Sequence, residues 1–111
     1  MLMATRPLTL RDDEAEIAVP IRIESPEQDS SGARFCRYEI AWPHGRWSSA
    51  GWGVDAVQAV LLTMQKIGTE IYASEYHKSS RLLWTAPGRG YGFPVPCNIR
   101  DHLIGDDALE A

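Results

Sequence analysis

The residue types that most often perform chemistry are present in this chain, but they are scattered along it. The three histidines are His44, His77 and His102, and no two stand four residues apart as paired zinc ligands on one helix would. The two cysteines, Cys36 and Cys97, form no C-x-x-C pair, so neither a zinc site nor a thioredoxin-type motif is indicated. We expect two reduced thiols, with a disulfide as the alternative, because geometry decides whether two cysteines can bond. The sequence therefore predicts no metal, no cofactor and no catalytic residue, and favours a protein that is not an enzyme.

The stretch AGWGVDAVQAVLLTM, residues 50–64, places two glycines and an aspartate before an apolar helix. Gly51 and Gly53 suit the corner where a strand turns into a helix, because glycine permits backbone angles that other residues avoid. Asp55 falls at the helix cap or in the first turn, where a carboxylate accepts backbone N–H bonds and complements the helix dipole. Catalysis by Asp55 would need a second acid, a histidine or a metal ligand, and none stands nearby in the sequence. We therefore interpret Asp55 as structural.

Aromatic and arginine side chains give the stronger indication of binding. The segment GRGYG, residues 88–92, lacks the lysine and the spacing of a phosphate-binding loop. Tryptophan, tyrosine and arginine are enriched at the energetic centres of protein interfaces. We predict that Trp47, Arg89 and Tyr91 contact a partner. The alternative is that the four tryptophans of this short chain mostly fill its core.

Composition limits the class of protein. The chain has 111 residues, which predicts one domain spanning residues 1–111. The net charge of −4 argues against nucleic-acid binding, which usually needs a basic face. No apolar run is long enough for a signal peptide or a membrane span. We therefore predict a cytoplasmic protein that contacts neither nucleic acid nor membrane.

The elements that must position these residues follow from periodicity. Alternating apolar residues predict strands, and we expect them at residues 6–11, 15–24, 34–42, 46–52 and 81–86. Pro20 lacks an N–H group, which places its strand at an edge or beside a bulge. The segment 87–96 is rich in glycine and proline and is predicted to be irregular, and the acidic tail from about residue 105 to 111 is predicted to fray.

One long helix is predicted over residues 54–73. Its apolar stripe at helical spacing comprises Val57, Val60, Leu61, Met64, Ile67, Gly68 and Ile71. The opposite face comprises Asp55, Ala59, Thr63, Lys66 and Glu70. Leu62 falls outside the stripe, and Gly68 lies on it, which indicates a close approach to a strand. The predicted fold is α+β: a three- to five-stranded antiparallel sheet with one long amphipathic helix packed on one face.

The segment GVDAVQAVLLTMQKIG, with CRYEI before it, resembles a family of small uncharacterised bacterial proteins (a domain of unknown function). The resemblance rests on a G-x-D-x-x-Q-A element that opens a helix, here Gly53, Asp55, Gln58 and Ala59, after a strand with a Cys-x-Tyr pattern, here Cys36 and Tyr38. It covers roughly residues 6–75. The resemblance implies an α+β fold and a bacterial origin, and it implies no activity.

Three functions remain open from the sequence. The first is a non-catalytic protein-binding module, comparable in size and acidity with immunity or accessory proteins of bacterial defence systems. The second is a small-molecule-binding protein or enzyme whose pocket lies between the helix start and the 87–96 loop and uses Asp55, Arg89 and Tyr91. The third is a self-associating structural protein, a homodimer formed through the strand near Pro20 or through Leu62.

Overall fold

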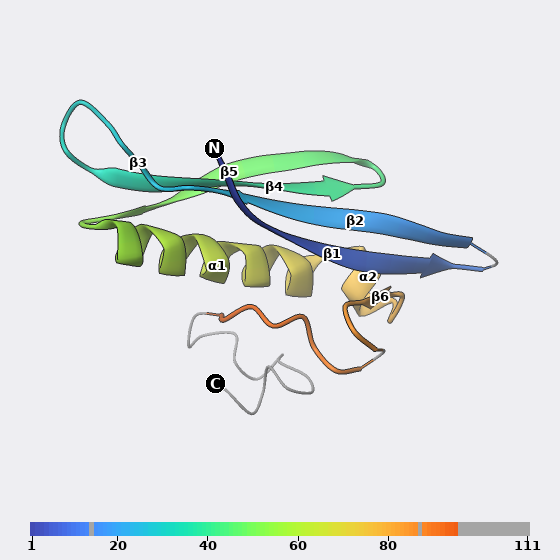
Figure 1. Cartoon of the computed structure of the whole chain (residues 1–111). Coiled ribbons are helices and arrows are strands. Elements are labelled where there is room, and N and C mark those ends of the chain that lie inside the picture. Colours follow the sequence, from blue (N-terminus) through green and yellow to red (C-terminus); the bar gives the residue numbers. More distant parts are fainter. Residues whose placement is uncertain (14, 87, 96–111) are drawn as a thin grey trace.

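A computed structural model describes residues 1–13, 15–86 and 88–95 (Figure 1). Its elements, in chain order, are β1 (Leu2–Asp12), β2 (Ala15–Glu24), β3 (Glu27–Gln28), β4 (Arg34–Trp42), β5 (Gly45–Gly53), α1 (Ala56–Ala73), α2 (Glu75–Lys78) and β6 (Leu82–Leu83). The α+β architecture is confirmed. Within these residues the sheet has six strands, more than predicted, because the short strand β3 pairs within a segment that was predicted to be a polar loop.

The sheet is antiparallel throughout, and β5 lies at one margin of it. Strand β5 pairs with one edge of β4 over the whole length of both strands. The other edge of β4 pairs with β2 and β3. Beyond β2 the order continues through β1 to β6. In the described part of the chain, β5 therefore pairs with β4 alone. Pro20 was predicted to lie at an edge or beside a bulge; β2 as a whole is an inner strand, but Pro20 lies in the half that pairs with β1 alone, because the pairing with β4 begins at Ile21.

The core lies on one face of the sheet, as the alternation predicts. The buried residues form one cluster, whose strand members include Leu8, Leu10, Val19, Ile21, Ile23, Cys36, Tyr38, Ile40 and Trp42. The opposite face of the sheet carries ion pairs such as Arg46 with Glu39, at 3.1 Å. An antiparallel sheet with one solvated face has this pattern of alternating apolar and polar residues.

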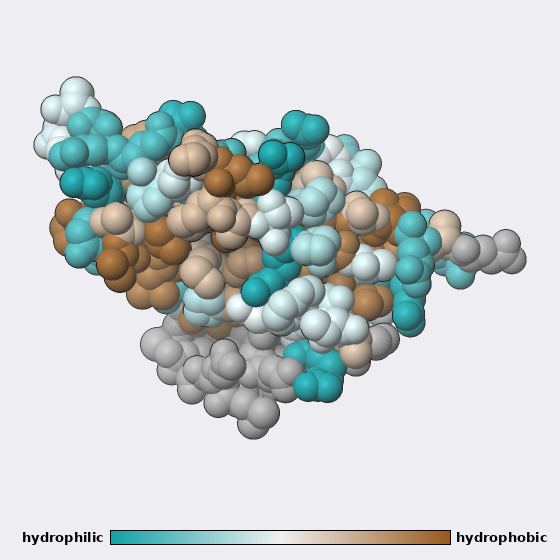
Figure 2. Space-filling model, viewed as in Figure 1, coloured by the Kyte–Doolittle hydropathy of each residue, from teal (hydrophilic) through white to brown (hydrophobic). Residues whose placement is uncertain are grey.

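Helix α1 packs across β4 and β5, but it is rotated from the predicted orientation. Ala59 and Thr63, expected on the outer face, are fully buried, whereas Val57 is 77% and Leu61 46% exposed. The stripe prediction was wrong for the first half of the helix because small side chains face the sheet there. Hydrophobic residues consequently gather on the surface where α1 begins (Figure 2).

Gly51 and Gly53 explain this rotation. A Cβ atom on Gly51 would lie 2.4 Å from the Thr63 nitrogen, and one on Gly53 would lie 2.6 Å from the Ala59 nitrogen. Neither glycine has a positive φ. These glycines are therefore required by the close approach of helix to strand, and not by the backbone angles of a corner as the sequence suggested.

The Thr63 side chain joins the two layers at that contact. Its hydroxyl donates to the Cys36 carbonyl oxygen at 2.7 Å and accepts from the Gly51 N–H at 2.9 Å. The side chain is fully buried. A buried polar group is stable only with such partners, so this polar residue belongs in the core.

The segment 88–95 forms a third layer beneath α1 (Figure 1). It contains neither helix nor strand, in line with the irregular structure predicted there. A Cβ on Gly68 would lie 2.5 Å from the Pro94 carbonyl oxygen, so Gly68 accommodates this segment and not a strand, contrary to the prediction. Arg6 holds the segment: its Nη1 donates to the carbonyls of Tyr91 and Gly92, and its guanidinium lies 3.9 Å from the Trp84 ring centre.

Two predictions concern residues outside the described part. The acidic tail at 105–111 and Cys97 both lie there. Cys36 carries a free thiol, fully buried, that donates to the Glu24 carbonyl oxygen at 3.1 Å. Burial raises the pKa of this thiol, which disfavours the reactive thiolate.

Candidate functional site

The structure separates the three residues predicted to contact a partner. Trp47 is 44% exposed on β5. Arg89 is exposed in the irregular segment. Tyr91 is 3% exposed, and its hydroxyl bonds to His77 Nδ1 at 2.7 Å. Tyr91 is therefore a core residue. Its ring packs edge-on against Tyr72 and His77, which leaves almost none of the side chain exposed.

A groove of about 510 Å³ runs between β5 and α1. One wall is a single ridge of the helix, with Leu62, Lys66 and Glu70 spaced four residues apart. The other wall is β5, which contributes Trp47 at one end and Trp52 at the other. Trp52 is 51% exposed, with its ring centre 4.8 Å from that of Phe35. The groove thus combines exposed aromatic rings with the margin of a sheet.

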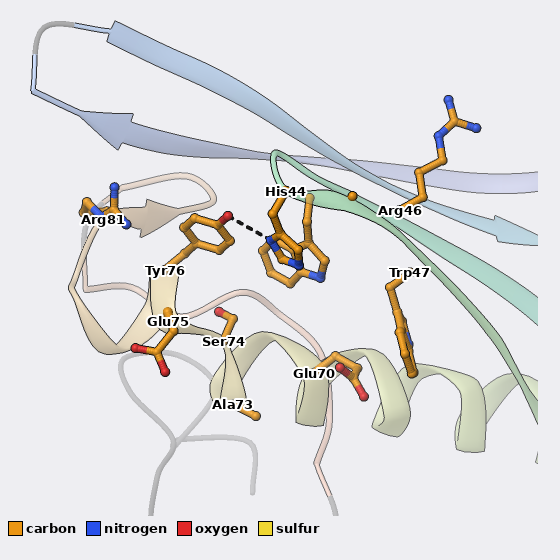
Figure 3. A pocket seen from close by; sticks show the side chains of 11 residues that line it. His44, Arg46, Trp47, Glu70, Ala73, Ser74, Glu75, Tyr76 and Arg81 are labelled. Atoms are coloured by element: carbon orange, nitrogen blue, oxygen red, sulfur yellow. Dashed lines mark hydrogen bonds between the residues drawn. The ribbon is translucent and has the colours of Figure 1, made fainter.

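The indole of Trp47 is fixed in place. Its Nε1–H donates to the Tyr38 hydroxyl at 3.0 Å. Burial raises the pKa of that hydroxyl, and the negative charge of Glu70 raises it further. Tyr38 therefore stays neutral and holds the indole, which extends from β5 toward the helix (Figure 3).

Lys66 crosses the groove between its two ends. Its Nζ donates to the Ala50 carbonyl oxygen at 2.7 Å and to Ser49 Oγ at 3.4 Å. In an antiparallel ladder the N–H and C=O of one residue point to the same side. Because the Ala50 carbonyl meets the helix side chain, Ala50 presents its backbone away from β4, at the open edge.

A second groove, of about 620 Å³, continues from Trp47 and Glu70 toward α2 (Figure 3). Trp42, His44 and Tyr76 form its far wall, where the rings of Trp42 and Tyr76 are stacked with centres 5.3 Å apart. His44 Nδ1 lies 2.9 Å from the Tyr76 hydroxyl. Trp47 and Glu70 line both grooves and so mark the point where they meet.

Among the described residues no group of three or more histidine, cysteine, aspartate or glutamate side chains could hold a metal ion. No helix in the described part is both long and apolar enough to cross a bilayer. Neither groove, nor a third one on the opposite face of the sheet, is lined by Asp55, Arg89 or Tyr91, so these grooves do not correspond to the pocket considered from the sequence.

Asp55 caps the helix, as its position predicts. Its Oδ1 accepts from the Gln58 N–H at 2.8 Å, while Gln58 Oε1 accepts from the Val54 N–H at 2.7 Å. We expect Asp55→Ala to lower the free energy of unfolding by about 1 kcal/mol, and Asp55→Asn to lower it much less, since asparagine also caps well. Urea denaturation of the three proteins measures this. Equal losses for both variants would contradict the capping role.

Two groove residues, Lys66 and Glu70, were not predicted as site residues from the sequence, and Leu62 was predicted only as a possible homodimer contact. Leu62, Lys66 and Glu70 occupy one ridge, and their spacing of four residues was visible in the sequence. The spacing alone does not show that this ridge faces β5, because the orientation of α1 decides which side of the helix lines the groove. The predicted apolar stripe included Val57 and Leu61, and it therefore placed the wrong side of the helix against the sheet.

The fold and the site define a class: an α+β domain with one solvated sheet face and an aromatic groove beside a free edge strand. Residues 4–95 match a family model described as Domain of unknown function (DUF6968). The chain therefore belongs to this family, which supports the resemblance to an uncharacterised domain family. Comparisons with the curated proteins and with the solved structures found no match.

Proposed function

We propose that this chain is a non-catalytic protein-binding module that takes up an extended segment of another protein along the edge of β5. One observation carries the proposal: in the described part of the chain β5 pairs only with β4, and its open edge is flanked by exposed apolar side chains. An unpaired edge strand is a template for a further strand, and many peptide-binding domains use it so. Main-chain hydrogen bonds supply affinity in that mode, and side-chain pockets supply specificity.

The groove beside β5 supplies such pockets. Trp47 lines the groove from the helix-facing side of β5, Trp52 reaches its rim from the opposite side, where it packs on Phe35, and Leu62 lines it from the helix. Tryptophan is the residue type most enriched at the centres of interfaces. Lys66 covers part of the edge at Ala50, which is how natural sheets limit indiscriminate pairing. The edge is thus protected against general aggregation and open to a partner that displaces one lysine hydrogen bond.

The biological role that we propose is that of an immunity- or accessory-type protein in the bacterial cytoplasm. The small size and the net charge of −4 support it. The likeness to such proteins is one of analogy, since a fold alone does not define a function. No described groove supports the alternative of an enzyme that uses Asp55.

Substitutions in the groove test the proposal. We expect the double variant Trp52→Ser/Leu62→Ser to lose a captured partner protein, with affinity reduced about 100-fold because two anchors of about 1–2 kcal/mol each are removed. The measurement is affinity capture from lysate of the source organism, followed by titration of the purified partner. Ile17→Ser is the matched control, since Ile17 is as exposed as Leu62 but lies at the far end of β2.

Three outcomes separate the proposed functions. Loss of the partner only in the double variant supports the binding module. Equal capture by all three proteins contradicts it. A wild-type dimer in light scattering that dissociates in the double variant would assign the same edge to self-association, because a C2 dimer uses one patch on both copies.

A further inference from the structure

The place where the two grooves meet has the chemistry of a cation site. Trp47 presents an indole face and Glu70 a carboxylate, and both point into the same opening (Figure 3). The negative charge of Glu70 is close enough to Tyr38 to raise the pKa of that hydroxyl, and Tyr38 in turn accepts the hydrogen bond of Trp47. The carboxylate and the indole therefore belong to one cluster.

The other charges near the opening are already engaged. Lys66 donates to the Ala50 carbonyl oxygen and to Ser49. Arg46 pairs with Glu39 at 3.1 Å on the opposite face of the sheet. Arg81 lies 3.4 Å from Asp12. Each of these three cations bonds to a group other than Glu70.

Glu70 differs from its acidic neighbour in the same groove. Glu75 pairs with Lys78 at 3.8 Å. Glu70 forms no hydrogen bond and no ion pair with any described residue, although it is only partly exposed. A half-buried carboxylate beside an aromatic face is best neutralised by a cation placed over that ring.

We propose that Trp47 and Glu70 bind an arginine or lysine side chain of the protein segment that pairs with β5. The inference rests on the proposed function and deepens it, because it states the charge of the partner. A cation over the indole face gains cation–π attraction, and the carboxylate pairs with it. A partner strand along β5 passes Trp47, so one of its side chains enters the opening while its backbone pairs with the edge.

The test uses defined peptides and isotope-labelled full-length protein. The first peptide is acetylated and amidated, with arginine flanked on each side by a valine–threonine pair. The second carries citrulline, the neutral isostere, in place of arginine. NMR titration follows the indole N–H of Trp47 and the backbone amides of β5. We expect the arginine peptide to bind about tenfold more tightly than the citrulline peptide.

Variants assign the preference to Glu70. Glu70→Gln should abolish the difference between the two peptides, since it removes the charge and keeps the shape. Glu75→Gln, in the same groove, should retain the difference because that carboxylate pairs with Lys78. Thermal denaturation confirms that both variants remain folded.

Each other outcome overturns the inference. Equal affinities of the two peptides, with shifts along β5, would leave the binding module standing and remove the cation site. The absence of any chemical-shift change at about 1 mM peptide would also overturn the cation site. The capture experiment with the Trp52→Ser/Leu62→Ser variant tests the proposed function separately. Free arginine amide binding as tightly as the peptide would indicate a site for small cations and not for a protein segment.

Discussion

Replacing Gly51 with alanine is expected to lower the free energy of unfolding by about 3–5 kcal/mol. The new Cβ would lie 2.4 Å from the Thr63 nitrogen and 2.9 Å from the Leu62 carbonyl carbon. These are backbone atoms of a helix, so no side-chain rotation can relieve the overlap. The helix must move away from the sheet, and the two hydrogen bonds of the Thr63 hydroxyl are then lost.

The effect is large relative to the stability of a domain of this size, which is typically about 5–15 kcal/mol. Thermal unfolding should therefore shift by about 15 °C or more. Ser48→Ala is the control, since Ser48 is exposed on the same strand and its substitution adds no atom. If the free energy of unfolding of Gly51→Ala were within about 1 kcal/mol of that of the wild type, the close approach of α1 to β5 would be incorrect.

The second large effect is expected from Thr63→Val. Valine has the shape of threonine, so the packing is kept while the hydrogen bonds of the Thr63 hydroxyl to the Cys36 carbonyl and to the Gly51 N–H are both removed. A hydrogen bond contributes about 0.5–1.5 kcal/mol net, which predicts a loss of about 1–3 kcal/mol for the two bonds. Urea denaturation with a common m-value gives the difference directly.

Two comparisons isolate the role of the hydroxyl. Thr69→Val makes the same change on the same helix, where the hydroxyl bonds only to the Gln65 carbonyl of its own turn, and should cost little. Thr63→Ser keeps the hydroxyl and loses one methyl group, at about 1 kcal/mol. A Thr63→Val variant no less stable than Thr63→Ser would show that the two hydrogen bonds contribute nothing to stability.

These two positions also control the candidate binding site. Thr63 lies between Leu62 and Lys66 in sequence, so its bonds to the sheet fix the distance of the whole ridge from β5. A helix displaced at Thr63 would separate Lys66 from Ala50 and Glu70 from Trp47. Stability and recognition therefore depend on the same contact between helix and strand.

The buried faces of the strands were predictable because apolar and polar residues alternate along each strand, and successive side chains of a strand point to opposite faces of the sheet. Cys36, Tyr38, Ile40 and Trp42 share the buried face that their period of two assigns to them. The cap at Asp55 was predictable because it is a local interaction over three residues. Each of these features depends on neighbours in the sequence, and such neighbours stay neighbours in the fold.

The face of α1 could not be predicted from its own sequence. Hydropathy places Val57 and Leu61 inside and Ala59 and Thr63 outside, and the structure reverses both pairs. The reason lies in β5, where two glycines allow the helix to approach so closely that only small side chains fit between the layers. Shape complementarity between two distant segments outweighed the hydrophobic pattern of one.

The sequence by itself thus determined the α+β class, the strand faces, the capped helix and the absence of a recognisable catalytic motif. The tertiary structure decided which aromatic rings are available: Trp47 and Trp52 are exposed, whereas Tyr91 is enclosed. It also decided that β5 lies at the margin of the sheet, and that Glu70 stands beside Trp47. Exposure and proximity depend on how distant segments pack, and local periodicity carries no information about that packing.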